Sequence, residues 1–255
     1  MFTHRIDQPS DRKASLNWLL LGFNGGFINA GGFLVTGRFV THVTGFATLF
    51  GVDSVQHGWD EALGILSVPL FFLGGSFLAG WLIDRRAFRG EAPHYDYVMA
   101  LCAGALLVAA FATSFTHFVP FGETLRVKEV YLVLAALCLA SGLQNAALTS
   151  SSGNSVRTTH LTGITTDLGL GLARLLSLGS RDERAARERH ANRLRAGTIL
   201  AFIAGSAVGA WVFFHTRYVG FLIPAFIAAT AAWQGRRTKL RLRAALGASP
   251  SREDA

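Results

Sequence analysis

Charged residues are scarce in this sequence. Asp, Glu, Lys and Arg make up 16% of its 255 residues, against about a quarter in an ordinary soluble domain. With an apolar fraction of 51%, the chain is neither disordered nor fibrous, because such chains lack the apolar surface that a packed core needs. A soluble single domain is also disfavoured, since it requires an evenly charged coat, whereas here the charge is clumped between apolar runs.

Cysteine and the common catalytic motifs are also rare or missing. The two cysteines, Cys102 and Cys138, both lie inside apolar runs, and the sequence has no CxxC or Cys/His cluster. Neither a disulfide framework nor a zinc site is therefore indicated, and we expect both thiols to pack in apolar surroundings. A P-loop, a dinucleotide fingerprint, GxSxG and HExxH are all absent. The sequence predicts that the protein is not an enzyme and has no cofactor.

What the sequence does contain is a series of long apolar stretches. About 20 helical residues are needed to cross the hydrocarbon of a bilayer. The polar N-terminus has no cleavage site, so we expect the first stretch to be retained in the membrane. The sequence predicts an all-α integral membrane protein with six transmembrane helices, at 16–35, 62–83, 97–119, 130–149, 196–214 and 219–233.

The positions of Lys and Arg predict the orientation. If the N-terminus is cytoplasmic, the inner segments hold twenty of the 24 Lys and Arg residues and the outer segments hold four. Basic residues favour the cytoplasmic side, so we expect a multi-pass protein with both termini cytoplasmic. The expected extramembrane parts are a tail at 1–15, an external loop at 120–129, a basic loop at 180–195 and a basic tail at 235–255 that ends in disorder.

The basic loop at 180–195 reads SRDERAARERHANRLR. Its spacing is typical of a cytoplasmic helix with ion pairs between residues i and i+4. We interpret it either as a solvated connector or as a surface for a partner or anionic lipid. Although the net charge is +8, the basic residues separate apolar blocks as in membrane proteins, so nucleic acid is not expected as a partner.

An internal repeat divides the chain into two halves, 16–119 and 130–234. The pattern T-H-x-T-G-x-x-T-x-x-G occurs at 41–51 and again at 159–169. Upstream, G-x-x-N-A occurs at 26–30 and 142–146; downstream, a Gly-Ser pair and a Trp recur at 75–81 and 205–211. Each half contains three predicted spans, and an odd number inverts the second copy in the membrane. We therefore predict two inverted three-helix repeats.

The two T-H-x-T-G motifs follow the first and fourth predicted spans, on opposite sides of the membrane. An additional full span after each motif would place Arg85, Arg86 and Arg89 outside, against the charge rule. A re-entrant or broken segment fits better, and such backbone is stable at membrane depth only when it is packed in protein or lines a cavity. We expect the two segments to approach the midplane from opposite sides.

With these motifs the chain resembles the YoaK-like family of bacterial inner-membrane proteins, a family of unknown function. The resemblance is carried by residues 26–30, 39–45, 143–146 and 156–163, and it extends over roughly residues 16 to 235. It implies a location in the bacterial inner membrane. In the family the first motif more often reads S-H-M-T-G-N, whereas Thr41, Val43 and Phe46 occupy the variable positions here.

Polar groups inside a membrane protein are the first candidates for function, because burying them in lipid is costly. His42 and His160 could bind a ligand or relay protons, or they could pin their loops by hydrogen bonds. Asn29 and Asn145 could contact the motifs, bridge helices or bind substrate. Asp167 could form a salt bridge with Arg157 or Arg174, bind a cation, or join both histidines at a metal. The predicted substrate-binding residues are Asn29, Thr41, His42, Thr44, Gly45, Asn145, Thr159, His160, Thr162, Gly163 and Asp167.

The leading functional hypothesis is a small secondary transporter or permease for a small solute, with the two motifs on its pathway. The alternative is a membrane scaffold or regulator that acts through the basic loop at 180–195. An intramembrane enzyme is disfavoured by the missing motifs. The expected partners are the lipid bilayer and the solute, and a compact six-span unit is compatible with a homodimer.

Overall fold

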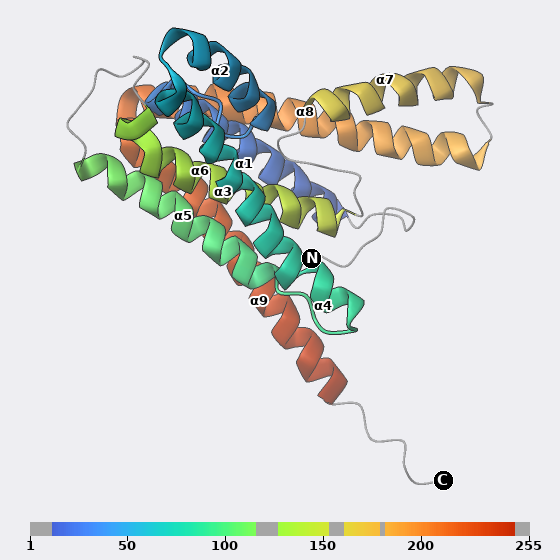
Figure 1. Cartoon of the computed structure of the whole chain (residues 1–255). Helices are drawn as coiled ribbons and strands as arrows, with labels where there is room; N and C mark the ends of the chain where they lie inside the picture. Colours follow the sequence, from blue (N-terminus) through green and yellow to red (C-terminus); the bar gives the residue numbers. More distant parts are fainter. Residues whose placement is uncertain (1–11, 116–126, 153–160, 179–181, 248–255) are drawn as a thin grey trace, which may run out of the picture.

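The computed structural model describes residues 12–115, 127–152, 161–178 and 182–247. Every regular element in these ranges is a helix, as predicted (Figure 1). The elements are α1 (Arg12–Thr36), α2 (Val43–Gln56), α3 (Trp59–Leu82), α4 (Asp84–Phe88), α5 (Tyr95–Phe115), α6 (Val127–Ser151), α7 (Leu161–Ser177), α8 (Glu183–Thr216), the 3-10 helix η1 (Arg217–Phe221) and α9 (Leu222–Gly247).

Several helices have the length and composition of membrane spans. Five stretches of the described residues meet both criteria, and the fifth contains two helices, α8 and α9, separated by η1. Each predicted span overlaps one of these stretches. The chain is therefore a helical protein of membrane type, with candidate membrane-spanning stretches at Ala14–Thr36, Trp59–Phe88, Tyr95–Ala112, Val130–Ser151 and Glu183–Leu240.

Two helices are longer than expected. α8 begins at Glu183 and runs for 34 residues, so most of the charged segment at 180–195 is its first half rather than a separate helix. At 1.5 Å per residue α8 is about 50 Å long, well beyond the roughly 30 Å of a hydrocarbon core. α9 continues to Gly247, so helix extends into the tail for which disorder was expected; residues 248–255 lie outside the described ranges.

α1 and α8 run parallel in close contact. A Cβ added at Gly26 would overlap the carbonyl oxygen of Phe202, and one at Gly205 would overlap the carbonyl oxygen of Phe23. The hydroxyl of Ser206 donates to the carbonyl of Gly26 at 3.2 Å. Small residues allow such close approach of helices in membranes, so Gly26 and Gly205 determine how this pair crosses.

α3 and α6 also run parallel, and they cross in the same way. A Cβ at Gly75 would overlap the carbonyl oxygen of Leu139, and one at Gly142 would overlap that of Phe72. The hydroxyl of Ser76 donates to the carbonyl of Gly142 at 3.3 Å. The α3–α6 crossing thus contains the same Gly, Gly and Ser contacts as the α1–α8 crossing.

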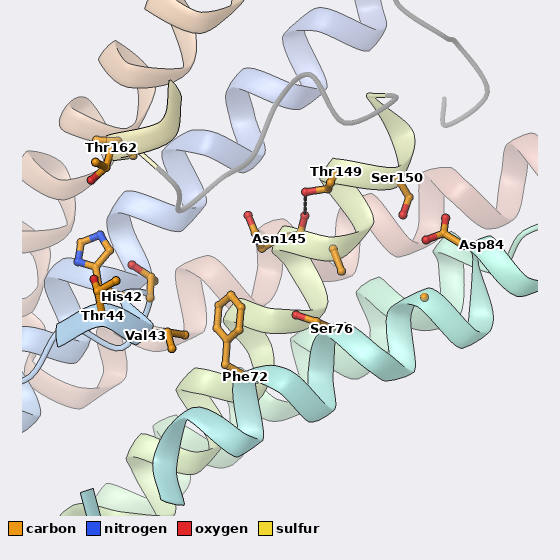
Figure 2. Close-up of a pocket in the computed structure, with 14 residues that line it drawn as sticks. His42, Val43, Thr44, Phe72, Ser76, Asp84, Asn145, Thr149, Ser150 and Thr162 are labelled. Carbon is orange, nitrogen blue, oxygen red and sulfur yellow. Dashed lines mark hydrogen bonds between the residues drawn. The ribbon is translucent and has the colours of Figure 1, made fainter. Parts of the chain in front are cut away.

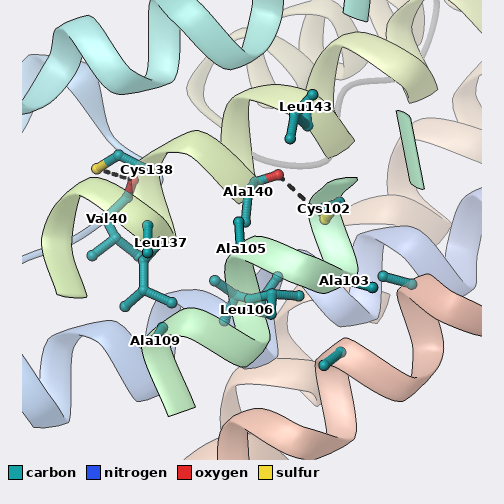
Figure 3. Packing of buried hydrophobic residues seen from close by; sticks show 14 of the residues in the cluster. Val40, Cys102, Ala103, Ala105, Leu106, Ala109, Leu137, Cys138, Ala140 and Leu143 are labelled. Atoms are coloured by element: carbon teal, nitrogen blue, oxygen red, sulfur yellow. Dashed lines mark hydrogen bonds between the residues drawn. The ribbon is translucent and has the colours of Figure 1, made fainter. Parts of the chain in front are cut away.

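α5 and α9 lie side by side, and α5 also packs on α6. Buried side chains fill the α5–α6 contact, among them Leu106, Leu137 and Leu143, all at 0% exposure (Figure 3). Both cysteines are buried and free, as expected from their apolar surroundings. The Cys102 thiol donates to the carbonyl of Ala140 at 3.4 Å, which ties α5 to α6.

A buried polar contact joins α1 to α6 between the two crossed pairs. The amide of Asn24 donates to the side-chain oxygen of Gln144 at 2.6 Å, and the amide of Gln144 donates to the carbonyl of Leu21 at 3.1 Å. Asn24 and Gln144 are both almost completely buried. Buried amides hold a position well only when they are hydrogen-bonded, so this contact fixes where α1 passes α6.

α7 and the first half of α8 form a hairpin that projects sideways from the other helices (Figure 1). Glu188 lies at its centre and accepts from Arg195 at 2.7 Å. Glu188 also lies 3.7 Å from Arg174 of α7. Glu188 therefore pairs with α7 and, over seven residues, with Arg195 of its own helix, and no i to i+4 ion pair is present between the described residues of 182–195.

Candidate functional site

A cavity of about 660 Å³ lies where the two repeated motifs meet. It is bounded by the segment between α1 and α2, the second halves of α3 and α6, and the start of α7 (Figure 2). Residues of the first motif thus share one space with residues of the second. The lining residues are Thr41, His42, Val43, Thr44, Phe72, Ser76, Gly80, Asp84, Asn145, Ala146, Thr149, Ser150, Leu161 and Thr162.

The first motif is held at the cavity by Asn29 of α1. The side-chain oxygen of Asn29 accepts from the Thr41 hydroxyl at 2.8 Å and from the Thr41 backbone N–H at 3.4 Å. Asn29 and Thr41 are both buried, at 6% and 4% exposure. Of the roles predicted for Asn29, contact with the motif is the one that the structure contains.

The chain turns back along α1 before it reaches the motif. α1 ends at Thr36, and Gly37 then adopts a positive φ of 68°, a conformation that glycine adopts without steric cost. Asn29 lies seven residues before the end of α1, about 10 Å back along the helix at 1.5 Å per residue. The thiol of Cys138 in α6 donates to the carbonyl of Val40 at 3.2 Å. The first motif therefore lies beside the interiors of α1 and α6.

His42 lines the cavity between α1 and α2. It is half-buried, and its ring centroid lies 5.6 Å from that of Phe39. Phe39 in turn stacks on Phe33 of α1, with 4.6 Å between centroids. The imidazole forms no hydrogen bond with a described residue, so both ring nitrogens are available to a ligand. Among the described residues, the His42 side chain thus makes none of the hydrogen bonds that pinning of the loop would require.

Asn145 and the start of α7 form the other side of the cavity. Asn145 is half-buried on α6, and its backbone carbonyl accepts from the Thr149 hydroxyl at 2.7 Å. Leu161 and Thr162, from the second motif, lie in the first turn of α7. Thr159 and His160 lie outside the described residues.

Four of the predicted binding residues that the structure describes do not line the cavity. Asn29 reaches it only through its hydrogen bond to Thr41. Gly45 lies in the first turn of α2, and Gly163 lies in the first turn of α7, but neither belongs to the cavity wall. Asp167 is exposed in the second turn of α7. Arg174, one of its expected partners, lies instead against Glu188, and Arg157 is outside the described ranges.

α3 contributes a wall that the motifs did not predict. Phe72, Ser76 and Gly80 follow one another at spacings of four residues, so they lie on one face of α3; Asp84, four residues further on, begins α4. The recurrence of Gly-Ser at 75–76 and 205–206 was the available signal for Ser76. Asp84 lies two residues after the end of α3, whereas in the sequence it counts as the first residue of a loop. Nothing local distinguishes it from other loop acids.

Arg38 has a structural role outside the cavity. Its guanidinium donates to the carbonyl of Thr36 at 3.1 Å, and the residue is only 7% exposed. Burial lowers the pKa of Arg38 below its ordinary value, and the nearby carboxylates of Asp53 and Glu61 oppose this shift. The charge is therefore compensated within the segment that joins α1 to α3.

Among the described residues, no group of three His, Cys, Asp or Glu side chains is arranged to hold a metal ion.

Comparison with known proteins identifies the family of the chain. Residues 18–233 match a family model described as "Protein of unknown function (DUF1275)", in agreement with the YoaK-like resemblance of the motifs. No curated protein matches, and no solved structure matches. The family match covers both motifs and every residue that lines the cavity.

Proposed function

Because the chain belongs to the DUF1275 family, a family of unknown function, we propose from its site that it is a small secondary transporter or permease. The solute is a small polar molecule that binds between the two motifs. Three helices of each half form the transport unit, and the second half is inverted with respect to the first. Such inverted repeats place the binding site near the bilayer midplane, between the halves.

The two crossed helix pairs support the inverted repeat. Gly26 and Gly142 are equivalent in the sequence repeat, and so are the Gly-Ser pairs at 75–76 and 205–206. Each pair joins one helix from each half, with a Ser hydroxyl donating to the equivalent Gly carbonyl. Exchange of the halves therefore maps one crossing onto the other, as a two-fold axis requires.

The helix directions also agree with six crossings. If the chain alternates from side to side, the first and fifth spans should be parallel, and so should the second and fourth. α1 runs parallel to α8, with Gly22 near Thr198 and Gly31 near Phe213. α3 runs parallel to α6, since Ser67 and Tyr131 meet at 2.7 Å and Gly75 meets Leu139 further along.

The shared cavity is the observation that carries the transporter proposal. Its volume of about 660 Å³ falls within the 300–1,000 Å³ range of small-molecule sites. One side belongs to the α1–α8 pair, because Asn29 holds Thr41 and α7 packs on α8. The other side belongs to the α3–α6 pair. Rocking of one glycine-packed pair against the other would open the cavity to alternate sides.

A ligand screen tests this proposal. Purified protein is heated with a library of metabolites and ions, since a ligand that binds the folded state raises the apparent melting temperature. We expect at least one ligand whose stabilisation is lost in His42→Ala but kept in Thr48→Ala, a matched change on the exposed surface of α2. Proteoliposomes should then take up that ligand, and His42→Ala should reduce uptake about tenfold or more. A tenfold loss corresponds to about 1.4 kcal/mol of binding free energy, the contribution expected of one uncharged contact.

The scaffold hypothesis predicts a different pattern. Its support is the projecting α7–α8 hairpin, which carries many exposed charges beside the bundle (Figure 1). A scaffold would tolerate His42→Ala and would lose its function when the arginines of 180–195 are neutralised. Normal uptake after neutralisation of the hairpin, together with loss of uptake in His42→Ala, would reject the scaffold. The reverse result would reject the transporter.

A further inference from the structure

Asp84 introduces a negative charge into the cavity wall. It is the acidic residue among the described lining residues, and none of those residues is Lys or Arg. Its carboxylate lies over Gly80, where an added Cβ would be 3.9 Å from the nearer oxygen. Figure 2 shows Asp84 and Ser150 at the end of the cavity opposite His42.

The neighbouring arginines are engaged elsewhere. The guanidinium of Arg85 lies over the ring of Trp81, 3.7 Å from the centroid. Arg86 lies 2.9 Å from Glu91 and donates to the carbonyl of Ala92 at 3.0 Å. Asp84 forms no ion pair with a described residue, so its charge is uncompensated in the part of the chain that the structure describes. An uncompensated carboxylate in a cavity attracts cations.

Three of the six hydroxyl groups of the wall reinforce this preference. The Thr41 hydroxyl donates to Asn29 at 2.8 Å, the Thr149 hydroxyl donates to the carbonyl of Asn145 at 2.7 Å, and the Ser76 hydroxyl donates to that of Gly142. A hydroxyl has one hydrogen and two lone pairs. Because these three hydrogens are already used, the groups can offer only lone pairs to a ligand, which suits a donor or a cation.

The volume of the cavity and the apolar part of its wall suit an organic cation better than an inorganic ion. A cavity of about 660 Å³ would leave most of its volume empty around an inorganic cation. Phe72, Ala146 and Leu161 supply apolar surface in the same cavity, and an aromatic face attracts ammonium groups. A ligand with an ammonium group and an apolar body matches both parts of the wall.

We propose that the cavity binds a small organic ammonium ion, with Asp84 as its counter-charge. This inference rests on the proposed function, because it assigns a substrate class to the same cavity. It also specifies a residue that the sequence motifs do not contain. Loss of the Asp84 charge should therefore remove the preference for cations and leave the cavity itself intact.

Thiol modification tests the inference without a known substrate. Ser150→Cys places a thiol in the cavity wall. The native Cys102 and Cys138 are buried, so the reaction of the unaltered chain measures the background labelling. The thiolate attacks the methanethiosulfonate sulfur and forms a mixed disulfide as methanesulfinate leaves. The two probes carry trimethylammonium or sulfonate groups. The measured quantity is the ratio of the cationic to the anionic reaction rate at Ser150→Cys, divided by the same ratio at Leu176→Cys. We expect a value of about ten, at the lower end of the range for charged clefts.

Variants at Asp84 connect that ratio to one charge. In Ser150→Cys, Asp84→Asn should reduce the ratio to about one, while Asp84→Glu should keep it. Asp60→Asn removes an acid from the first turn of α3, outside the cavity, and should also keep it. Equal rates in Ser150→Cys, faster reaction of the anion, or no effect of Asp84→Asn would overturn the inference. If Ser150→Cys reacts with neither reagent from either side while Leu176→Cys reacts, the cavity is not accessible and the proposed function fails.

Discussion

The hydrogen bond between Asn29 and Thr41 determines where the first motif lies. Asn29 is in α1 and Thr41 is in the segment that follows it, and both are buried. The same Asn29 oxygen accepts from the hydroxyl and from the backbone N–H of Thr41. A buried donor that loses its acceptor incurs its full desolvation cost. Asn29 is therefore a positioning residue for the cavity, and it need not touch the ligand.

Asn29→Ala should destabilise the protein and weaken ligand binding together. The expected loss is about 1–3 kcal/mol, because two buried donors lose their acceptor, and each kcal/mol lowers the melting temperature of a chain of this size by about 2–4 °C. Thermal unfolding in detergent measures the effect.

A double-mutant cycle with Thr41→Val separates the hydrogen bond from general packing. We expect a coupling of about 1 kcal/mol between the two positions, the usual contribution of one hydrogen bond. Thr48→Val is the control, because its hydroxyl is exposed and bonds only within α2. Strictly additive effects of Asn29→Ala and Thr41→Val would show that this hydrogen bond does not hold the motif.

The residues of the site were partly predictable. Thr41, His42, Thr44, Asn145 and Thr162 were chosen from the repeat, and all line the cavity. The pattern succeeded there because equivalent segments of two halves converge on one space. Asp167 does not line the cavity with them, because helical register turns this side chain to the exposed face of α7. It missed Asp84, whose position depends on how α3 packs.

At the scale of the helices, glycines decide which pairs can form. Four glycines lie at the two crossings, and in each case an added methyl group would overlap a backbone carbonyl oxygen of the partner helix. Backbone cannot move aside as a flexible side chain can. The hydrophobic effect provides little drive for helix association in lipid, so close packing contributes much of the stability there.

Gly75→Ala should lower the stability of the folded protein far more than Gly74→Ala. The first change places a methyl group against Leu139 of α6, whereas a Cβ at Gly74 meets nothing within 4 Å. Overpacking of this kind costs about 1–3 kcal/mol, while alanine at the open position should have no adverse contact. Size-exclusion profiles and melting temperatures of the two variants provide the comparison.

The equivalent crossing should respond in the same way. Gly205→Ala overlaps the carbonyl of Phe23, and its loss of stability should resemble that of Gly75→Ala. Gly104→Ala, on α5 with open space around it, is the matched control. A stable Gly205→Ala variant beside an unstable Gly75→Ala variant would contradict the equivalence of the two crossings.

For the whole molecule, the charge pattern and the helix directions lead to one topology. The inner segments carry most of the Lys and Arg residues, and α1 and α8 run opposite to α3 and α6 if all four cross the membrane. We predict that the two termini are cytoplasmic, because this arrangement meets both conditions. The loop at 120–129 should then be external, and the turn at Gly90 should be internal.

Reporter fusions in a bacterial host test this topology. Alkaline phosphatase, which is active only outside the cytoplasm, should be active when inserted in 120–129 and inactive when inserted at Gly90 or fused to the C-terminus. A fluorescent protein at the C-terminus should give the complementary signal. Phosphatase activity at Gly90 would place Arg85, Arg86 and Arg89 outside and would reject the six-span arrangement.

The sequence by itself determined the local properties of this protein. Helix, membrane character and family membership depend on composition and on motifs that are short and contiguous, so they can be read from neighbouring residues. Only the tertiary structure decided that α1 pairs with α8, that α3 pairs with α6, and that Asp84 and Phe72 face the motifs. These contacts join residues far apart in the chain, and their partners depend on packing surfaces that no local pattern specifies.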